Sequence, residues 1–504
     1  MKQEKMIAQK MFALLIFLIV FSFGLIWAAF VPARNEAPDE ASHVNMIYFL
    51  KNHHRIPVFN HEEDLIPTQY DPQTMSKVYY SMAYISPVSY LPYVFALNGP
   101  MEDISKTNVM SARLISVLLL ALAALFMYLA LANIEPKNNI AATVATLFIF
   151  LIPQVIFSAG YINVEPFALL FSSLSLYFLS KIMANNLTWQ NYLYFGLCLG
   201  VLGLAKPNYY IFILFVSLII LFFLKTSPKR QTIKYFFSSG AIFILINLWW
   251  WVRNIYLFGD PLILSYIKKQ IVGNAPEGIN SLADQGYNLL TIFSRNDFIK
   301  FTAGGFFANL GGANIFLPLI FYLIFFAIII FSFVLAFKSY RNNRIYLWPV
   351  IITILSAVLY FAYKNLSDYS PQGRHLFPLL FPICLILYLS LSALKHLWQK
   401  IFGILIISFV FFSSLYGFWL TISRYYVTGL AYVNQSNFGS VAEGFSWHIF
   451  STKNYQNLIL YIFNGNPYLL GIPVVIITAA ILFFSLVLVF WSISKTNPRA
   501  DPVD

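Results

Sequence analysis

The chain has 504 residues, of which 59% are hydrophobic and only 10% are charged, and its mean hydropathy is +0.70. Soluble domains carry about 25% charged residues, and disordered chains combine low hydrophobicity with high charge, so this composition excludes both classes. The net charge of +12 would suggest a nucleic-acid partner in a soluble protein. In a membrane protein, lysine and arginine instead collect on the cytoplasmic side, so we expect no nucleic-acid partner. The two cysteines, Cys198 and Cys384, lie in apolar runs and offer neither a disulfide framework nor metal-ligand spacing.

The first apolar segment, 11–30, follows a basic start and has no convincing cleavage site after it. About 20 apolar residues suffice to span a bilayer, so we interpret this segment as a signal anchor that is retained. Further apolar segments cover approximately 112–133, 139–157, 166–183, 191–205, 208–224, 235–252, 315–337, 345–363, 376–394, 401–422 and 469–492. The sequence therefore predicts an all-α polytopic integral membrane protein with about twelve transmembrane helices.

The basic residues orient these helices. If the N-terminus is cytoplasmic, the short basic connections near 225–234, 338–344 and 395–400 all fall on the cytoplasmic side, as the positive-inside rule requires. The C-terminus is then cytoplasmic as well. The alternative is an odd number of helices with an inverted half, which would place the basic 225–234 connection outside.

Three connections on the predicted outer side are long, namely 31–110, 256–313 and 423–467, and they hold most of the acidic residues. We therefore expect any chemistry on the extracytoplasmic face. Within the first of them, the segment 80–97 is apolar but is interrupted by two prolines, so we expect helices that lie at the membrane interface and do not span it.

Nucleotide and metal chemistry have little support in the sequence. No P-loop or GxGxxG motif is present, and the predicted cytoplasmic connections are too short to form a nucleotide-binding domain. The spacing of His53, His54 and His61 fits no standard metal site, so no metal ligands are expected and a divalent ion is unsupported. We divide the chain into a transmembrane catalytic module, 1–400, and C-terminal helices, 401–504.

The sharpest polar cluster, Asn35-Glu36-Ala37-Pro38-Asp39-Glu40-Ala41-Ser42-His43, directly follows the first apolar segment. A helix that starts near Pro38 would place Asp39 and Glu40 in its first turn, and His43 would share a face with Asp39. A carboxylate held at the membrane surface near a histidine is a candidate general base. The alternative is a solvated acidic helix start.

Basic residues lie where three predicted spans meet the outer surface. Lys206 precedes a proline, Arg253 follows three tryptophans, and Arg374 is adjacent to His375. Cations at this depth are costly, and together they could bind a lipid-linked phosphate. Each could instead extend separately to lipid headgroups.

Glu165 in Asn163-Val164-Glu165-Pro166 is a second carboxylate on the same predicted side as Asp39. Taken alone, it is best explained as an acidic residue at the N-terminus of the next span, with Pro166 in the first turn.

These features together resemble the GT-C glycosyltransferases, in which an acidic pair follows the first transmembrane helix inside a long outward loop. The sequence is most similar there to the bacterial domain-of-unknown-function 2142 family, and more distantly to protein O-mannosyltransferases and lipid A aminoarabinose transferases. The segments that carry the resemblance are Pro38-Asp39-Glu40-Ala41-Ser42-His43, Ser86-Pro87-Val88-Ser89-Tyr90, Ala112-Arg113-Leu114-Ile115-Ser116, Asn163-Val164-Glu165-Pro166, Leu204-Ala205-Lys206-Pro207, Trp251-Val252-Arg253-Asn254 with Gly259-Asp260-Pro261, and Gln372-Gly373-Arg374-His375-Leu376-Phe377-Pro378.

The resemblance implies that a polyprenyl-phosphate sugar, such as an undecaprenyl-phosphate sugar, donates to a cell-envelope glycan or glycolipid acceptor outside the bacterial cytoplasmic membrane. It implies that Asp39 is the catalytic base of an inverting attack, with Glu40 and Glu165 as further catalytic acids. His43, Lys206, Arg253, Arg374 and His375 would bind substrate or lipid phosphate. Related sequences usually have aspartate where this chain has Glu165.

Two other classes remain open. A polysaccharide polymerase or ligase would also have many helices and large outer loops, and its essential residues would lie in 423–467. A lipid or solute transporter would show charged residues near helix centres and paired repeats, and the sequence shows few of the former and none of the latter.

Overall fold

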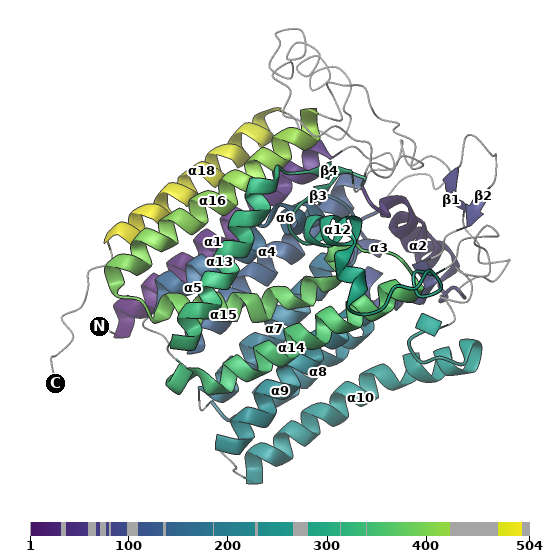
Figure 1. The fold of residues 1–504 in the computed structure, drawn as a ribbon, viewed down its shortest axis with the longest axis horizontal. Coiled ribbons are helices and arrows are strands. Elements are labelled where there is room, and N and C mark those ends of the chain that lie inside the picture. Colours follow the sequence, from purple (N-terminus) through teal and green to yellow (C-terminus); the bar gives the residue numbers. More distant parts are fainter. Residues whose placement is uncertain are drawn as a thin grey trace, which may run out of the picture.

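The protein is a bundle of long, apolar α-helices (Figure 1). The structure is a computed structural model, and it describes residues 2–31, 37–58, 67–70, 77–79, 82–97, 109–134, 138–184, 186–226, 230–265, 281–312, 314–338, 340–423 and 472–495. The long helices are α1 (Lys2–Phe30), α4 (Val109–Ile134), α5 (Asn139–Phe150), α6 (Pro153–Ala159), α7 (Glu165–Met183), α8 (Trp189–Ala205), α9 (Tyr210–Thr226), α10 (Arg230–Phe258), α13 (Leu319–Lys338), α14 (Tyr340–Ser367), α15 (Leu380–Ser392), α16 (His396–Ile422) and α18 (Ile472–Lys495).

Each of the twelve predicted membrane segments contains one of the helices above, in its described part. Within the described residues, ten helices are long and apolar enough to cross a membrane, or eleven if α5 and α6 count as one span. Those two helices meet at a bend of 70°, because Pro153 begins α6 and forces Ile152 out of the helical conformation. The remaining predicted span is α8, which has only 17 residues. The prediction of an all-α polytopic membrane protein is confirmed.

The helix termini gather at two opposite ends of the bundle. The N-terminal end carries the start of α1 and, in the last turns of α7, α9, α13 and α18, the lysines Lys181, Lys225, Lys338 and Lys495. The other end, which we call the α2 end, carries short elements. They are α2 (Glu40–His53), β1 (Pro67–Tyr70), β2 (Lys77–Tyr79), η2 (Met82–Tyr84), η3 (Pro87–Tyr90), α3 (Leu91–Val94), η5 (Pro207–Tyr209), η6 (Thr291–Ser294), α12 (Asn296–Phe307), β3 (Asn309–Leu310), β4 (Ile315–Phe316) and η7 (Gly373–Leu379).

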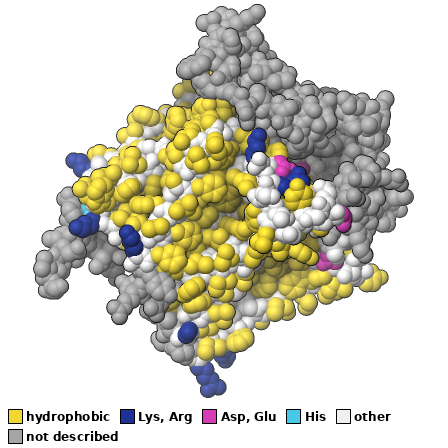
Figure 2. Space-filling model, viewed as in Figure 1, with side chains coloured by type: hydrophobic (Ala, Val, Ile, Leu, Met, Phe, Trp, Pro, Cys, Tyr) yellow, Lys and Arg dark blue, Asp and Glu magenta, His cyan; other side chains and the backbone are white. Residues whose placement is uncertain are grey.

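Side-chain type follows this division. Figure 2 shows a broad hydrophobic band with basic side chains at its left and lower edges, whereas the acidic side chains, together with a few basic ones, lie at its right, toward the α2 end. Large apolar side chains exposed on the long helices include Leu221, Phe237, Leu245, Leu319, Ile330, Phe412, Phe483 and Trp491. A soluble protein rarely exposes so much contiguous apolar surface, so this band is the face that contacts lipid.

The interior of the bundle is built around α1, α4 and α7. Helix α4 packs against both α1 and α7, and its residues Ala121, Ala123 and Ala124 are fully buried. Helices α16 and α18 lie along one side and α10 along the other (Figure 1). These three central helices begin or end at the α2 end, so their termini fix the positions of the polar residues there.

Glycines set the close contact between α8 and α10. A Cβ atom at Gly196 would lie 2.8 Å from the carbonyl oxygen of Ser239, and one at Gly200 would lie 2.5 Å from the side chain of Ile246. Across this contact the side-chain amide of Asn247 donates to the carbonyl of Gly200 at 3.0 Å. Small residues let membrane helices approach in this way without a hydrophobic driving force between them.

The predicted interfacial segment 80–97 forms three short helices at the α2 end, in its described part. Pro87 begins η3, and Pro92 lies in the first turn of α3. Tyr90 and Tyr93 are fully buried, so this segment packs into the end of the bundle. The predicted loop 423–467 lies outside the described residues except for Ser423.

Candidate functional site

Asp39 and Arg374 form an ion pair at the α2 end, although 335 residues separate them. The guanidinium Nη2 donates to Oδ2 of Asp39 at 2.7 Å, and its Nε donates to the side chain of Gln372 at 2.8 Å. Asp39 precedes α2 in a left-handed conformation, with φ of 64°, and its carboxylate does not cap the helix. The backbone conformation, which aspartate tolerates better than most residues, therefore turns the carboxylate away from its own helix toward Arg374.

The charge of Asp39 is stabilised by its neighbours. Burial alone would raise the pKa of Asp39, but the charge and hydrogen bond of Arg374, with the charge of Lys206, outweigh this effect and lower the pKa below its usual value. Its side chain keeps 36% of its surface exposed. The group is thus an accessible carboxylate, ionised at neutral pH, as a general base must be before it accepts a proton.

Glu165 and Lys206 form a second ion pair in the same cluster. Glu165 opens α7, and its backbone N–H donates to the side chain of Asn163 at 2.8 Å. The hydroxyl of Tyr209 donates to the other carboxylate oxygen at 3.0 Å. Both oxygens of Glu165 are therefore engaged, and the carboxylate holds Lys206 in place.

Glu40 lies next to Asp39 in the chain but points into the bundle. Its carboxylate accepts two hydrogen bonds from Arg113 of α4, at 2.9 and 2.6 Å, and one from the backbone N–H of Ile162 at 2.9 Å. Nη1 of Arg113 also donates to the carbonyls of Ala28 and Val31, at the C-terminus of α1. Glu40 and Arg113 are 3% and 1% exposed, so this pair is an internal anchor. The geometry favours a positioning role for Glu40, and its predicted part in catalysis stays a prediction.

His43 is buried one helical turn after Asp39. Its Nδ1 lies 2.7 Å from the hydroxyl of Tyr90 in η3. Burial, opposed by the charge of Asp39, lowers the pKa of His43 to about 3. The imidazole is therefore neutral, and it can contribute a hydrogen bond but no charge to the phosphate binding that the sequence suggested.

The neutrality of His43 predicts a pH dependence of stability. In the unfolded chain His43 binds a proton below its ordinary pKa of about 6.5, whereas in the folded chain it does so only near pH 3. The contribution of the neutral imidazole to the free energy of unfolding is therefore complete above pH 6.5 and is lost as the pH falls. Between pH 6.5 and 4.5 this loss amounts to about 2 kcal/mol. The melting temperature of a His43→Gln variant should therefore change less between pH 6.5 and pH 4.5 than that of wild type. Equal acid sensitivity of the two proteins would contradict a neutral His43.

Asp39 does not affect this comparison. Its lowered pKa stabilises the folded protein, and this stabilisation is lost only as the pH falls below 3.8, the ordinary pKa of aspartate.

Arg253 belongs to a neighbouring part of the α2 end. Its Nη2 donates to the carbonyl of Pro57 at 2.7 Å, and its guanidinium lies 4.9 Å from the ring centre of Trp250. These contacts connect α10 to the segment after α2. The predicted role of Arg253 in binding phosphate stays a prediction.

Three residues of the cluster were missed in the sequence. Tyr161 interacts electrostatically with Arg374, Asp39 and Glu165, and burial raises its pKa, so its hydroxyl stays protonated. Tyr209 contacts Glu165, as described above. Lys364, in the last turn of α14, lies close enough to Lys206 and His375 for their charges to interact. Lys364 could have been found in the sequence, because a lysine at the end of an apolar span is a candidate functional residue.

Helix α12 holds the segment that carries Arg374. A Cβ atom at Gly373 would overlap the backbone of Thr302 and Phe306, and one at Gly305 would lie 2.5 Å from the backbone nitrogen of Gly373. The two backbones therefore touch directly. Nearby, Arg295 pairs with Asp297 at 2.8 Å, and Tyr369 donates to the same carboxylate at 2.7 Å. Of the two sides of the connection between α14 and η7, Tyr369 therefore contacts the start of α12 and Gly373 contacts its second half.

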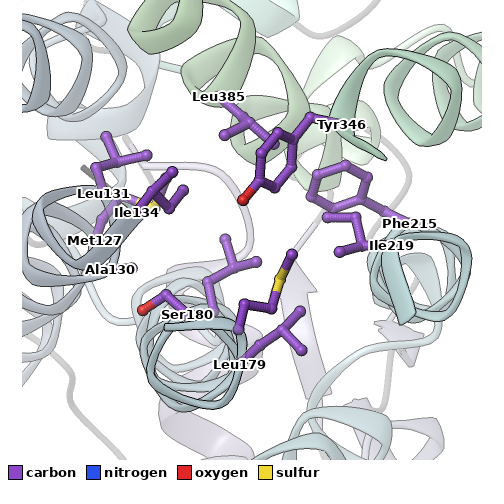
Figure 3. Close-up of a pocket in the computed structure, with 12 residues that line it drawn as sticks. Met127, Ala130, Leu131, Ile134, Leu179, Ser180, Phe215, Ile219, Tyr346 and Leu385 are labelled. Atoms are coloured by element: carbon purple, nitrogen blue, oxygen red, sulfur yellow. The ribbon is translucent and has the colours of Figure 1, made fainter. Parts of the chain in front are cut away.

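An apolar pocket lies elsewhere in the bundle (Figure 3). It is lined by residues of α4, α7, α9, α14 and α15, among them Met127, Leu131, Leu179, Phe215, Tyr346 and Leu385. Because α4 and α7 run from the α2 end to these residues, the pocket is in the half of the bundle nearer the N-terminal end. No group of three or more histidine, cysteine, aspartate or glutamate side chains that could hold a metal ion occurs among the described residues.

A known protein-family model matches part of the chain. Residues 72–257 match the model of the dolichyl-phosphate-mannose-protein mannosyltransferase family, a GT-C family. The match supports a membrane glycosyltransferase of the GT-C type. It covers Arg113, Glu165, Lys206 and Arg253, and it leaves the more specific resemblance to the domain-of-unknown-function 2142 family untested. No curated protein matches this chain.

Solved structures give distant similarities. The oligosaccharyltransferase of Archaeoglobus fulgidus tethered to an acceptor peptide is 15% identical over 82% of this chain and 55% of its own, with a TM-score of 0.47. The same organism's AglB with an inhibitory peptide and a dolichol-phosphate is 14% identical over 81% and 55%, with a TM-score of 0.44. ArnT of Cupriavidus metallidurans in the apo state is 13% identical over 92% and 73%, with a TM-score of 0.43. This chain spans about half the length of the archaeal enzymes, and similarity at these scores carries no conclusion about mechanism.

Proposed function

We propose that this protein transfers a sugar from a polyprenyl-phosphate donor to an extracytoplasmic acceptor of the bacterial cell envelope, with Asp39 as the base. The observation that carries the proposal is the ion pair between Asp39 and Arg374, which lies beside the pair of Glu165 and Lys206. An ionised, partly accessible carboxylate is thus adjacent to cations at the end of a membrane bundle. The family match supports the reaction class.

The proposed reaction is a single inverting displacement. Asp39 accepts the proton of the acceptor hydroxyl while the hydroxyl oxygen attacks the anomeric carbon of the donor sugar. The bond from that carbon to the phosphate oxygen breaks, and its electron pair leaves on the lipid phosphate. Arg374 and Lys206 stabilise the developing negative charge, and they do so without reorganisation because the two carboxylates already hold them in place.

The distribution of charge supports an extracytoplasmic α2 end. All the described carboxylates after Glu4 lie at the α2 end, in Asp39, Glu40, Glu165, Asp260, Asp284, Asp297 and Asp368. The lysines in the last turns of α7, α9, α13 and α18 lie at the other end. By the positive-inside rule, the N-terminus and the end of α18 would then be cytoplasmic. A transporter is disfavoured, because these charges gather at helix ends and not at the centres of spans.

The proposal is tested by binding of undecaprenyl phosphate and a panel of undecaprenyl-phosphate sugars to the detergent-purified protein, followed by thermal unfolding. A donor that raises the melting temperature of wild type identifies the sugar. Absence of a shift with every polyprenyl phosphate would contradict the proposed function.

Arg374→Ala should raise the KM for the donor by about tenfold or more, because a hydrogen bond from a charged donor contributes about 1.5–3 kcal/mol. The KM for the acceptor should change less. The matched control is Arg230→Ala, which removes a guanidinium from the start of α10 at the other end of the bundle. If only the acceptor KM changed, Arg374 would not bind the donor phosphate.

A further inference from the structure

A hydroxyl of the segment formed by η3 and α3, residues 87–94, holds the chain before Glu165. The hydroxyl of Tyr93 donates to the backbone carbonyl of Asn163 at 3.0 Å, and the hydroxyl of Ser116 in α4 lies 3.1 Å from it. The side-chain oxygen of Asn163 in turn accepts the backbone N–H of Glu165 at 2.8 Å. Tyr93 is fully buried, so one interior hydroxyl fixes the start of α7 to this segment.

A second hydroxyl of the same segment holds the chain before Lys206. Ser89 is fully buried and donates to the backbone carbonyl of Ala205 at 3.1 Å. Ala205 is the last residue of α8, and the last carbonyls of a helix have no partner within that helix. The bond therefore fixes the point at which the chain leaves α8. The two hydroxyls thus reach both sides of the second ion pair of the site.

Tyr90 connects the same segment to α2. Its hydroxyl lies 2.7 Å from Nδ1 of His43, one turn after Asp39. Three hydroxyls within five residues therefore contact parts of the chain that are 47, 70 and 116 positions away. A buried polar network whose members are paired restricts the chain to one arrangement. This network therefore sets the relative positions of α2, the start of α7 and the end of α8.

We infer that Ser89 and Tyr93 are positioning residues, which act on the reaction through Lys206. They hold the backbone on each side of its ion pair, and so they determine where the ammonium group lies relative to Asp39. This inference rests on the proposed function, in which Lys206 stabilises the charge that develops on the departing phosphate. A positive charge acts strongly on a transition state when the site already holds it in place. Neither hydroxyl needs to contact the substrate for this effect.

A simpler explanation is that the two hydroxyls contribute only to stability. Tyr128→Phe and Ser239→Ala are matched controls near the N-terminal end of the bundle. Tyr128 is fully buried in α4 and donates to the side chain of Asn139 at 3.2 Å. Ser239 is buried in α10 and donates to a carbonyl in the first turn of α8 at 2.8 Å. If stability alone explained the hydroxyls at the site, their removal would change transfer no more than these controls do.

The first experiment is a double-mutant cycle on steady-state transfer by the full-length protein, with the donor identified by thermal unfolding. Tyr93→Phe and Ser89→Ala should each lower kcat about tenfold or more, with a smaller change in the donor KM, because the displaced charge acts mainly in the transition state. Lys206→Gln removes the charge and keeps a hydrogen-bond donor for Glu165. In that background Tyr93→Phe should have little further effect, since the two changes act on the same group. The two control variants should leave kcat unchanged.

The second experiment needs no transfer activity. It measures the acetylation rate of Lys206 by mass spectrometry in the detergent-purified protein, with the exposed Lys338 as internal reference. Lys206 is 16% exposed and ion-paired, so it should react slowly in wild type. Tyr93→Phe and Ser89→Ala should raise this rate severalfold because they release the backbone beside the ion pair. The control variants should not raise it.

The outcomes distinguish the two proposals. If wild type neither binds nor uses any polyprenyl-phosphate donor, the proposed function is wrong, and the acetylation rates still decide whether the two hydroxyls position Lys206. An unchanged acetylation rate in Tyr93→Phe and Ser89→Ala would overturn the inference alone. Independent, multiplicative effects of Tyr93→Phe and Lys206→Gln on kcat would overturn it as well. The melting temperature of each variant shows that a lower kcat does not come from unfolding.

Discussion

The Asp39→Asn variant is expected to lose sugar transfer, by about 10²–10⁴-fold, while it remains folded and inserted. Asparagine has nearly the shape of aspartate and also tolerates the left-handed backbone conformation at φ of 64°. Its amide oxygen can still accept the hydrogen bond from Arg374. The substitution therefore removes the ability to accept a proton and little else. Transfer is measured with the donor identified by thermal unfolding.

Asp39→Glu is the companion variant, since it keeps the charge but moves the carboxylate by one methylene. It should retain more activity than Asp39→Asn if proton transfer is the role of this group. Donor binding should be largely unaffected in Asp39→Asn, because Arg374 keeps its charge. Near-normal transfer by Asp39→Asn, with an unchanged melting temperature, would exclude Asp39 as the base.

The second large effect is expected from Arg113→Met, which should destabilise the protein by about 3–5 kcal/mol. This change leaves the carboxylate of Glu40 buried at 3% exposure with only the N–H of Ile162 to bind it, and it removes the donor to the last carbonyls of α1. We expect a clearly lower melting temperature in detergent and a loss of transfer through displacement of Asp39.

The double variant Arg113→Met with Glu40→Gln provides the control. It removes both charges, so no buried ion remains unpaired, and it should recover part of the lost stability. A melting temperature for the double variant as low as for Arg113→Met alone would show that the pair is not coupled. Full transfer activity in Arg113→Met would show that the anchor does not position Asp39.

The helices could be predicted from the sequence because a bilayer demands long apolar segments, and each of the twelve predicted segments contains a helix in its described part. The bend between α5 and α6 was not predicted, although Pro153 is visible, because a proline within an apolar run can either kink a span or end a helix. The predicted span 191–205 is α8, whose 17 residues end at Ala205, before Lys206.

The site was predicted as a set of residues but not as a set of pairs. Asp39, Glu165, Lys206 and Arg374 were each recognised from their place after or before a span. Their pairing could not be deduced, because bonds between residues 335 positions apart depend on how the helices pack. For the same reason Glu40 was expected to act with Asp39, whereas its carboxylate faces Arg113. The sequence alone does not show which way a side chain at a helix start points.

Arg113 gives the protein a further property. From the start of α4 it holds the end of α1, the start of α2 and, through Glu40, the segment before α7, so the carboxylate that we propose as the base is positioned from within the bundle. The surface connections are not needed to position this carboxylate. We therefore expect the lengths and sequences of these connections to differ between related proteins, and the choice of acceptor with them, while the proposed transfer chemistry stays the same.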